Sequence, residues 1–317
     1  MDRKRRSILT AAMFGSLALP QVSWASGYPE KPITLIVPFG PGGATDNVVR
    51  AMAEKARRNL GQSIIIENKP GAAGMLGVNQ ISKMKSDGYT LAIAPDPIFI
   101  IPYLQKTQFD PVTDFTYVIQ LSGYALNVSA NINSTIKSWR DVVEQARARP
   151  GEISYGTTGV NGTMHLTMEK ISDIQKIKLN HVAFKGEAEI INALMGNHID
   201  LAVTAGSIAS MVEAQKAKPL LIWTRNRIEK WPDTPTLNDI GIDLVATAPF
   251  GIVAPRQLDP AITSKLHDAF KAALEDEEIK NLLASLNQEI SYLSSDDYQK
   301  YASNAIQTSK SRFSSVN

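Results

Sequence analysis

The chain has 317 residues, of which 44% are hydrophobic and 20% charged, an ordinary globular composition whose length indicates about two domains. The formal net charge is +2, but the first 25 residues hold an excess of three positive charges and the remainder carries −1, so nothing favours nucleic acid as a partner. The absence of cysteine excludes disulfides, thiolate metal sites, a cysteine nucleophile and a lipoprotein anchor.

Residues 1–25 predict a cleavable signal peptide. They begin with the basic run Arg3–Arg6, continue with an apolar stretch over Ile8–Leu19, and end in a small-residue cleavage site at Ala25. The apolar stretch is shorter than the roughly 20 residues that cross a bilayer, so we expect export rather than a membrane anchor. The general secretory (Sec) route and the twin-arginine route both fit this leader. A cytosolic tail is the alternative.

After the leader, the chain alternates apolar strands with amphipathic helices. The spacing predicts, in order, strand 33–39, helix 44–60, strand 63–67, helix 74–85 and strand 89–94. Continuous apolar strands separated by helices are typical of a parallel sheet that is covered on both faces. These elements form a first α/β unit over roughly residues 28–120.

A second α/β unit covers roughly residues 130–240. Its predicted elements are strand 151–155, helix 163–175, strand 180–184, helix 187–195, strand 199–204, helix 207–217 and strand 219–224. Two helical segments, near 260–286 and 295–313, close the chain.

Two β-prone stretches, 117–129 and 242–254, connect the two units. Two strand-like crossings between two α/β units predict a two-lobed α/β clamshell in which the chain returns to its first lobe. We place lobe 1 at 26–122 plus 247–317 and lobe 2 at 123–246. The carboxyl ends of strands would line the cleft, because open α/β sheets bind ligands there, and hinge closure would enclose the ligand.

A glycine-rich first loop, residues 38–46, lies between a predicted strand and a predicted helix. Gly42 and Gly43 let the backbone approach a ligand closely, and the free N–H groups at the helix start favour an anion. Thr45 or Asp46 can cap that helix. A tight turn without a ligand is the alternative reading. Neither nucleotide-binding glycine motif is present.

A second loop, residues 155–163, repeats this arrangement before the next helix. Its hydroxyl and amide groups, on Thr157, Thr158 and Asn161, can bond a carboxylate without adding charge. Taken alone it could be a flexible loop. Two such loops, one in each lobe, could face one cleft, and we therefore predict a small anionic ligand.

Catalytic patterns are weak in this sequence. The GxSxG and HExxH motifs are absent, and the four histidines, at 165, 181, 198 and 267, show no metal-ligand spacing. A hydrolase that uses His165 with Thr157 or Thr158 is the alternative, although a packing or capping histidine is the simpler interpretation. We expect no catalysis, no metal and no cofactor.

A series of ordered motifs resembles one known family closely. The motifs lie at residues 28–33, 37–39, 41–46, 67–72 with Gly74, 87–91, 109–111, 114–115, 165–166, 181–182, 184–186 and 232–236. In this order they are similar to the Bug family, the solute receptors of tripartite tricarboxylate transporters. The resemblance runs from about residue 28 to the C-terminus.

The resemblance implies a type II-like periplasmic binding protein fold and a monomeric receptor in the periplasm. Such a receptor holds a small carboxylate and delivers it to the membrane components of its transporter. Family members bind the carboxylate mainly through backbone amides and small hydroxyls of the two loops. Carried over, these groups belong to Gly42, Gly43, Ala44, Thr45, Thr157, Thr158, Gly159 and Asn161. Phe39, Asp46, Phe184 and Lys185 complete the expected site.

Three departures from the family pattern bear on the ligand. Asp96 lies in a Pro-Asp-Pro sequence where small residues are usual, Thr204 stands where Asp is frequent, and Pro249 replaces an aromatic residue. An acid at the cleft would repel a second carboxylate and accept an amine, although Asp96 could instead be a solvated turn residue. We therefore expect a monocarboxylate, a dicarboxylate or an amino acid rather than a citrate-like ligand. A receptor that presents its closed form to a periplasmic sensor domain is the alternative.

Overall fold

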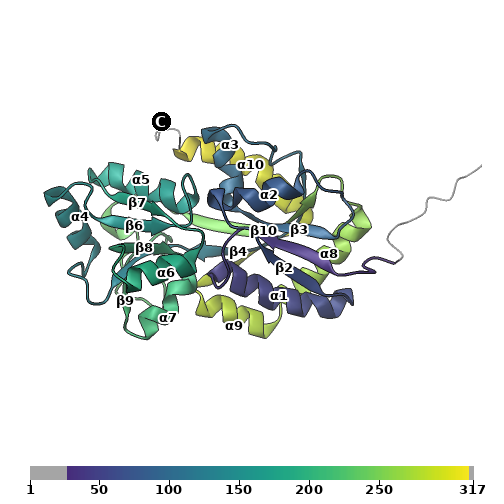
Figure 1. Ribbon diagram of the computed structural model, residues 1–317, viewed down its shortest axis with the longest axis horizontal. Helices are drawn as coiled ribbons and strands as arrows, with labels where there is room; N and C mark the ends of the chain where they lie inside the picture. Colours follow the sequence, from purple (N-terminus) through teal and green to yellow (C-terminus); the bar gives the residue numbers. More distant parts are fainter. Residues whose placement is uncertain (1–26, 314–317) are drawn as a thin grey trace, which may run out of the picture.

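The computed structural model describes residues 27–313, which form two sheets covered by helices (Figure 1). The first sheet has six strands in the order β11-β4-β10-β3-β1-β2. Their bounds are β1 Ile33–Val37, β2 Ile64–Asn68, β3 Thr90–Pro95, β4 Phe115–Ala125, β10 Thr247–Pro255 and β11 Gln288–Leu293. Strand β1 is parallel to β2 and β3, whereas β10 runs antiparallel between β3 and β4.

The second sheet has five strands in the order β7-β6-β8-β5-β9. Their bounds are β5 Asn127–Asn131, β6 Ser154–Thr157, β7 Asn180–Ala183, β8 Leu201–Thr204 and β9 Ala217–Ile222. Strand β6 is parallel to β7 and β8, so the loops that follow these strands emerge at one edge of the sheet.

Helices cover both faces of each sheet (Figure 1). In the first lobe, α2 (Met75–Ile81), α3 (Ile101–Leu104) and α10 (Ser295–Phe313) lie on one side, and α1 (Ala44–Leu60), α8 (Pro260–Leu274) and α9 (Glu277–Ser285) lie on the other. In the second lobe, α4 (Trp139–Ala148) and α5 (Thr163–Gln175) face α6 (Glu187–Met195) and α7 (Ala209–Glu213) across the sheet. Strand residues such as Ile33, Leu35 and Val37 are fully buried between these layers, as a doubly covered sheet requires.

Two crossings connect the lobes, and the predicted two-lobed clamshell is confirmed. Strand β4 pairs with the first sheet as far as Ala125, and β5 begins two residues later in the second sheet. The return crossing enters β10 at Thr247. We propose that the first lobe boundary lies between residues 122 and 123, within β4, and the second between residues 246 and 247, where β10 begins.

Some elements differ from those the sequence predicts. The expected helix 207–217 is a short 3-10 turn followed by α7, which ends at Glu213, because Gln215 takes a left-handed φ of 54° before β9 begins. The expected helix 260–286 is divided into α8 and α9, and the Asp276 side chain caps α9. Helix α4 and strand β11 were not predicted. Strand β11 exposes its apolar residues Ile290 and Tyr292 and buries the polar Gln288, so its pattern does not mark a buried face.

No helix in the described part of the chain is long and apolar enough to span a membrane. The predicted signal peptide, residues 1–25, lies outside the described residues.

Candidate functional site

The first and second loops meet where the two lobes touch. The amide of Gly40 donates to the carbonyl oxygen of Lys185 across the cleft, with an N···O distance of 3.1 Å. The Thr163 hydroxyl donates to the Asp96 carboxylate at 3.0 Å, again from one lobe to the other. Gly159 lies so close to Ala73 that an added Cβ would be 2.9 Å from the Ala73 nitrogen. The structure is therefore a closed form of the clamshell.

A cavity of about 30 Å³ remains between the two loops. It is lined by Phe39, Gly43, Ala44, Thr45, Tyr124, Thr158, Met164 and Glu187. A space of this size holds one or two water-sized molecules but no organic acid. A ligand must therefore enter while the lobes are apart, and hinge motion is the usual way for two lobes to separate.

The first loop presents helix N–H groups that its own side chains do not cap. Helix α1 begins at Ala44 with Gly43 as the N-cap residue, which has no side chain, so the expected cap by Thr45 or Asp46 is not formed. The Asp46 carboxylate instead accepts hydrogen bonds from Gly42, Arg50 and Asn68 at 2.8–3.0 Å. Burial alone would raise the pKa of Asp46, but these donors hold it below its ordinary value. Asp46 therefore fixes the shape of the loop from within the first lobe.

Thr45 is paired with a tyrosine that the sequence analysis missed. Its hydroxyl is hydrogen-bonded to that of Tyr124, which lies on β4 near the crossing between the lobes. The Tyr124 ring stacks on Phe250 of the return strand, with centroids 5.0 Å apart and planes 14° apart. Burial raises the pKa of Tyr124, so it stays a neutral hydroxyl. A long β-prone crossing that contains an aromatic residue was the one available signal for it.

Two neutral histidines shape the second loop. His181 Nε2 lies 2.7 Å from the Thr157 hydroxyl, and the Asn161 amide donates to His165 Nδ1 at 3.2 Å. The two imidazole rings contact each other, with centroids 4.1 Å apart. Burial lowers the pKa of both, that of His181 to about 4. His165 accepts from the loop backbone through Nδ1, an arrangement that positions the loop.

Glu187 is the most prominent residue that the sequence analysis did not select. It is the first residue of α6, and only 7% of it is exposed. Its carboxylate accepts hydrogen bonds from the Ala205 amide and the Ser207 hydroxyl within the second lobe, and Glu187 lines the cavity together with Ala44 of the first lobe. Burial raises its pKa, against the effect of these donors. A carboxylate of one lobe thus lies at the helix N-terminus of the other.

Asp96 makes the opposite connection. It is 6% exposed, so it is not a solvated turn residue, and its carboxylate accepts from Thr163, the first residue of α5. Each of the two loop helices therefore has an acidic side chain from the facing lobe at its first turn.

Comparison with known proteins identifies the family. Residues 48–317 match the family described as the tripartite tricarboxylate transporter family receptor. The chain belongs to this receptor family. It is 38% identical over 301 residues to the "UPF0065 protein in gbd 5'region" of Cupriavidus necator, which covers 95% of this chain and 92% of that protein. It is 27% identical over 271 residues to the protein BugT of Bordetella pertussis, with 82% of each chain covered. The resemblance to the Bug family is confirmed.

Solved structures share the receptor fold. A periplasmic transporter protein superposes with a TM-score of 0.87 at 29% identity, covering 92% of this chain and 98% of that one. An R. palustris protein solved with adipate gives a TM-score of 0.83 at 27% identity, covering 90% and 97% of the two chains.

The remaining residues of the predicted binding site differ in their burial and in their hydrogen bonds. Phe184 is half-buried and donates its amide to the Thr157 carbonyl at 2.8 Å. The Lys185 side chain is exposed, so this residue meets the first lobe through its backbone. Thr204 is fully buried, and within residues 27–313 its hydroxyl has no hydrogen-bond partner. The Gly42 amide is taken by Asp46.

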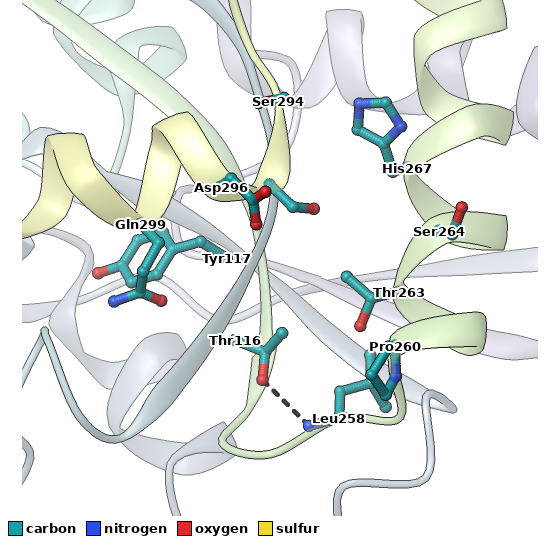
Figure 2. Close-up of a pocket in the computed structure, with 11 residues that line it drawn as sticks. Thr116, Tyr117, Leu258, Pro260, Thr263, Ser264, His267, Ser294, Asp296 and Gln299 are labelled. Atoms are coloured by element: carbon teal, nitrogen blue, oxygen red, sulfur yellow. Dashed lines mark hydrogen bonds between the residues drawn. The ribbon is translucent and has the colours of Figure 1, made fainter.

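A larger hollow of about 450 Å³ lies away from the cleft, between β4, α8 and α10 (Figure 2). In it, the Leu258 amide donates to the Thr116 hydroxyl at 3.1 Å. Its walls include Thr263, His267 and Asp296, and all of them belong to the first lobe. Closure of two lobes cannot enclose a ligand there, so the cleft is the better candidate for the receptor site. Over residues 27–313, no group of three or more histidine, aspartate or glutamate side chains is arranged to hold a metal ion.

Proposed function

We propose that this receptor captures a small carboxylate in the periplasm and delivers it to the membrane components of a tripartite tricarboxylate transporter. The observation that carries the proposal is the meeting of the N-termini of two loop helices, α1 and α5, whose N-cap residues are glycines, at one inter-lobe cleft. Helix N-termini bind anions through their free N–H groups and their dipoles. The adipate found on a 27% identical neighbour supports a carboxylate as the ligand class.

The ligand would hold the lobes together. The first loop contributes Phe39, Gly43 and Thr45, and the second contributes Thr158 and Gly159. A ligand that touches both loops binds the closed form more tightly than the open form and shifts the population towards it. The closed form would be the state that the transporter recognises. We propose a mono- or dicarboxylate or an amino acid as the ligand, bound without chemical change by a monomer.

The predicted signal peptide also supports a function in the periplasm. The leader at residues 1–25 carries the basic, apolar and small-residue parts of a cleavable signal peptide. Removal of the leader would release a mature receptor into the periplasm.

A ligand screen on the mature protein tests the proposal. Thermal unfolding is measured against a panel of monocarboxylates, dicarboxylates and amino acids, since a ligand that binds only the native state raises the melting temperature. The best compound is then titrated by calorimetry, recovered unchanged by chromatography, and added during small-angle X-ray scattering. We expect a dissociation constant in the micromolar range or below and a smaller radius of gyration with ligand. If no panel member binds, or if the bound compound is chemically converted, the proposal is wrong.

A further inference from the structure

The carboxylate position at the N-terminus of α1 is held by the protein's own Glu187. Glu187 lines the inter-lobe cavity together with Ala44, whose amide is the first N–H of α1, and the Glu187 Cβ lies 3.8 Å from the site of an added Cβ on Gly43. A free carboxylate bound at this helix start would use that amide as a donor. Glu187 thus stands where a ligand carboxylate of the first loop would stand.

This position is built into the fold. Glu187 opens α6, its neighbour Gly186 is the N-cap residue, and its backbone nitrogen lies 3.9 Å from the site of an added Cβ on Gly43. Donors from Ala205 and Ser207 fix both carboxylate oxygens within the second lobe. Because the second lobe already holds the carboxylate, lobe closure brings it close to Ala44 without a rearrangement of α6.

The charge around Glu187 disfavours a second anion. It shares the cavity with Thr45, Tyr124 and Thr158, whose hydroxyls are neutral, and the described lining residues include no lysine, arginine or histidine. Asp96 adds another acid at the first turn of α5. Like charges that share a buried site disfavour each other's ionised form. A ligand carboxylate beside Glu187 would therefore meet repulsion without a compensating base.

We propose that Glu187 is a specificity-determining residue: it fills the carboxylate position at the N-terminus of α1, so the cleft accepts a ligand with one carboxylate and rejects a dicarboxylate. The inference rests on the proposed function, because it names which carboxylates the same cleft binds. The single ligand carboxylate is held by the second loop, and the group that faces Glu187 is neutral or cationic.

Chemical rescue of Glu187→Ala tests this role in the mature protein. The substitution leaves the Ala205 amide and the Ser207 hydroxyl without their acceptor, and we expect a melting temperature lower by roughly 3–8 °C. Formate at about 100 mM should fill the vacated position and raise that temperature by a few degrees. Wild-type protein should not respond beyond its response to sodium chloride at the same ionic strength. Glu144→Ala, an exposed acid of α4 in the same lobe, is the matched control and should not respond either.

The affinity for a dicarboxylate is a second test of this role of Glu187. Succinate should bind Glu187→Ala, and the isosteric Glu187→Gln, at least ~10-fold more tightly than wild type, since the repelling charge is gone. The Gln variant keeps the size and an acceptor oxygen, so it serves if the Ala variant fails to fold. The proposal is overturned if formate does not raise the melting temperature of Glu187→Ala, or if wild type and variants bind succinate with equal affinity. If no carboxylate binds wild type, the proposed function fails, but formate rescue still decides the role of Glu187.

Discussion

Replacing Gly186 by alanine should weaken ligand binding while leaving the fold of each lobe intact. The φ of Gly186 is −178°, an extended conformation that alanine adopts without strain. An added Cβ would lie 3.0 Å from the nitrogen and 3.2 Å from the Cα of Gly40, which belongs to the backbone of the facing lobe. The methyl group therefore obstructs only the closed form. Overpacking of this kind costs about 1–3 kcal/mol, which corresponds to a roughly 5- to 150-fold increase in the dissociation constant.

Gly40→Ala provides the matched control at the same contact. Its Cβ would lie 3.7 Å from the Lys185 carbonyl oxygen, an ordinary van der Waals separation, so its dissociation constant should change less than about twofold. Titration calorimetry with the best ligand of the screen measures both variants. Urea unfolding of the ligand-free proteins checks that their lobes are equally stable. An unchanged dissociation constant for Gly186→Ala, or an equal loss in both variants, would refute the idea that closure at this contact drives binding.

Three further predictions concern the polar groups of the cleft. Asp96→Ala should change the order of affinities across the ligand panel more than it changes the melting temperature, and unchanged affinities would contradict a role for Asp96 in selection. Tyr124→Phe removes the partner of the buried Thr45 hydroxyl and should lower the free energy of unfolding by about 1–2 kcal/mol, measured in urea. His165 and His181 have folded pKa values below the ordinary 6.5, so they stabilise the fold fully above pH 6.5, and this contribution is lost as the pH falls towards 4. Because the two histidines are partly exposed, we expect this loss to be about 1–2 kcal/mol. Urea unfolding at pH 7 and at pH 4.5 measures it, and the free energy of unfolding should change less between the two pH values in His181→Asn than in wild type. An equal change in both proteins would exclude these histidines as its source.

The sequence predicted the clamshell because its signals are local. The residues of an apolar segment such as 33–39 are enough by themselves to predict a buried strand. The glycines of the first loop likewise predict a backbone that a ligand can approach closely. The failures had one local and one long-range cause. Gln215 takes a left-handed conformation just after α7, and a glutamine in the sequence does not predict this conformation. Strand β11 gains its place by pairing with β4, a partner more than 160 residues away in the chain.

The chemistry of the cleft could not be read in the same way, because each part is completed by the facing lobe. Glu187 looks like an ordinary first-turn acid of α6, favourable to its own helix dipole. Only lobe closure brings it close to Ala44, about 140 residues earlier in the sequence, and brings Asp96 to Thr163. Family motifs selected the backbone donors of both loops, whereas the two acids that meet them are outside those motifs. The backbone of the loops would therefore make the protein a carboxylate receptor, and the acids from the facing lobe would decide which carboxylate it accepts.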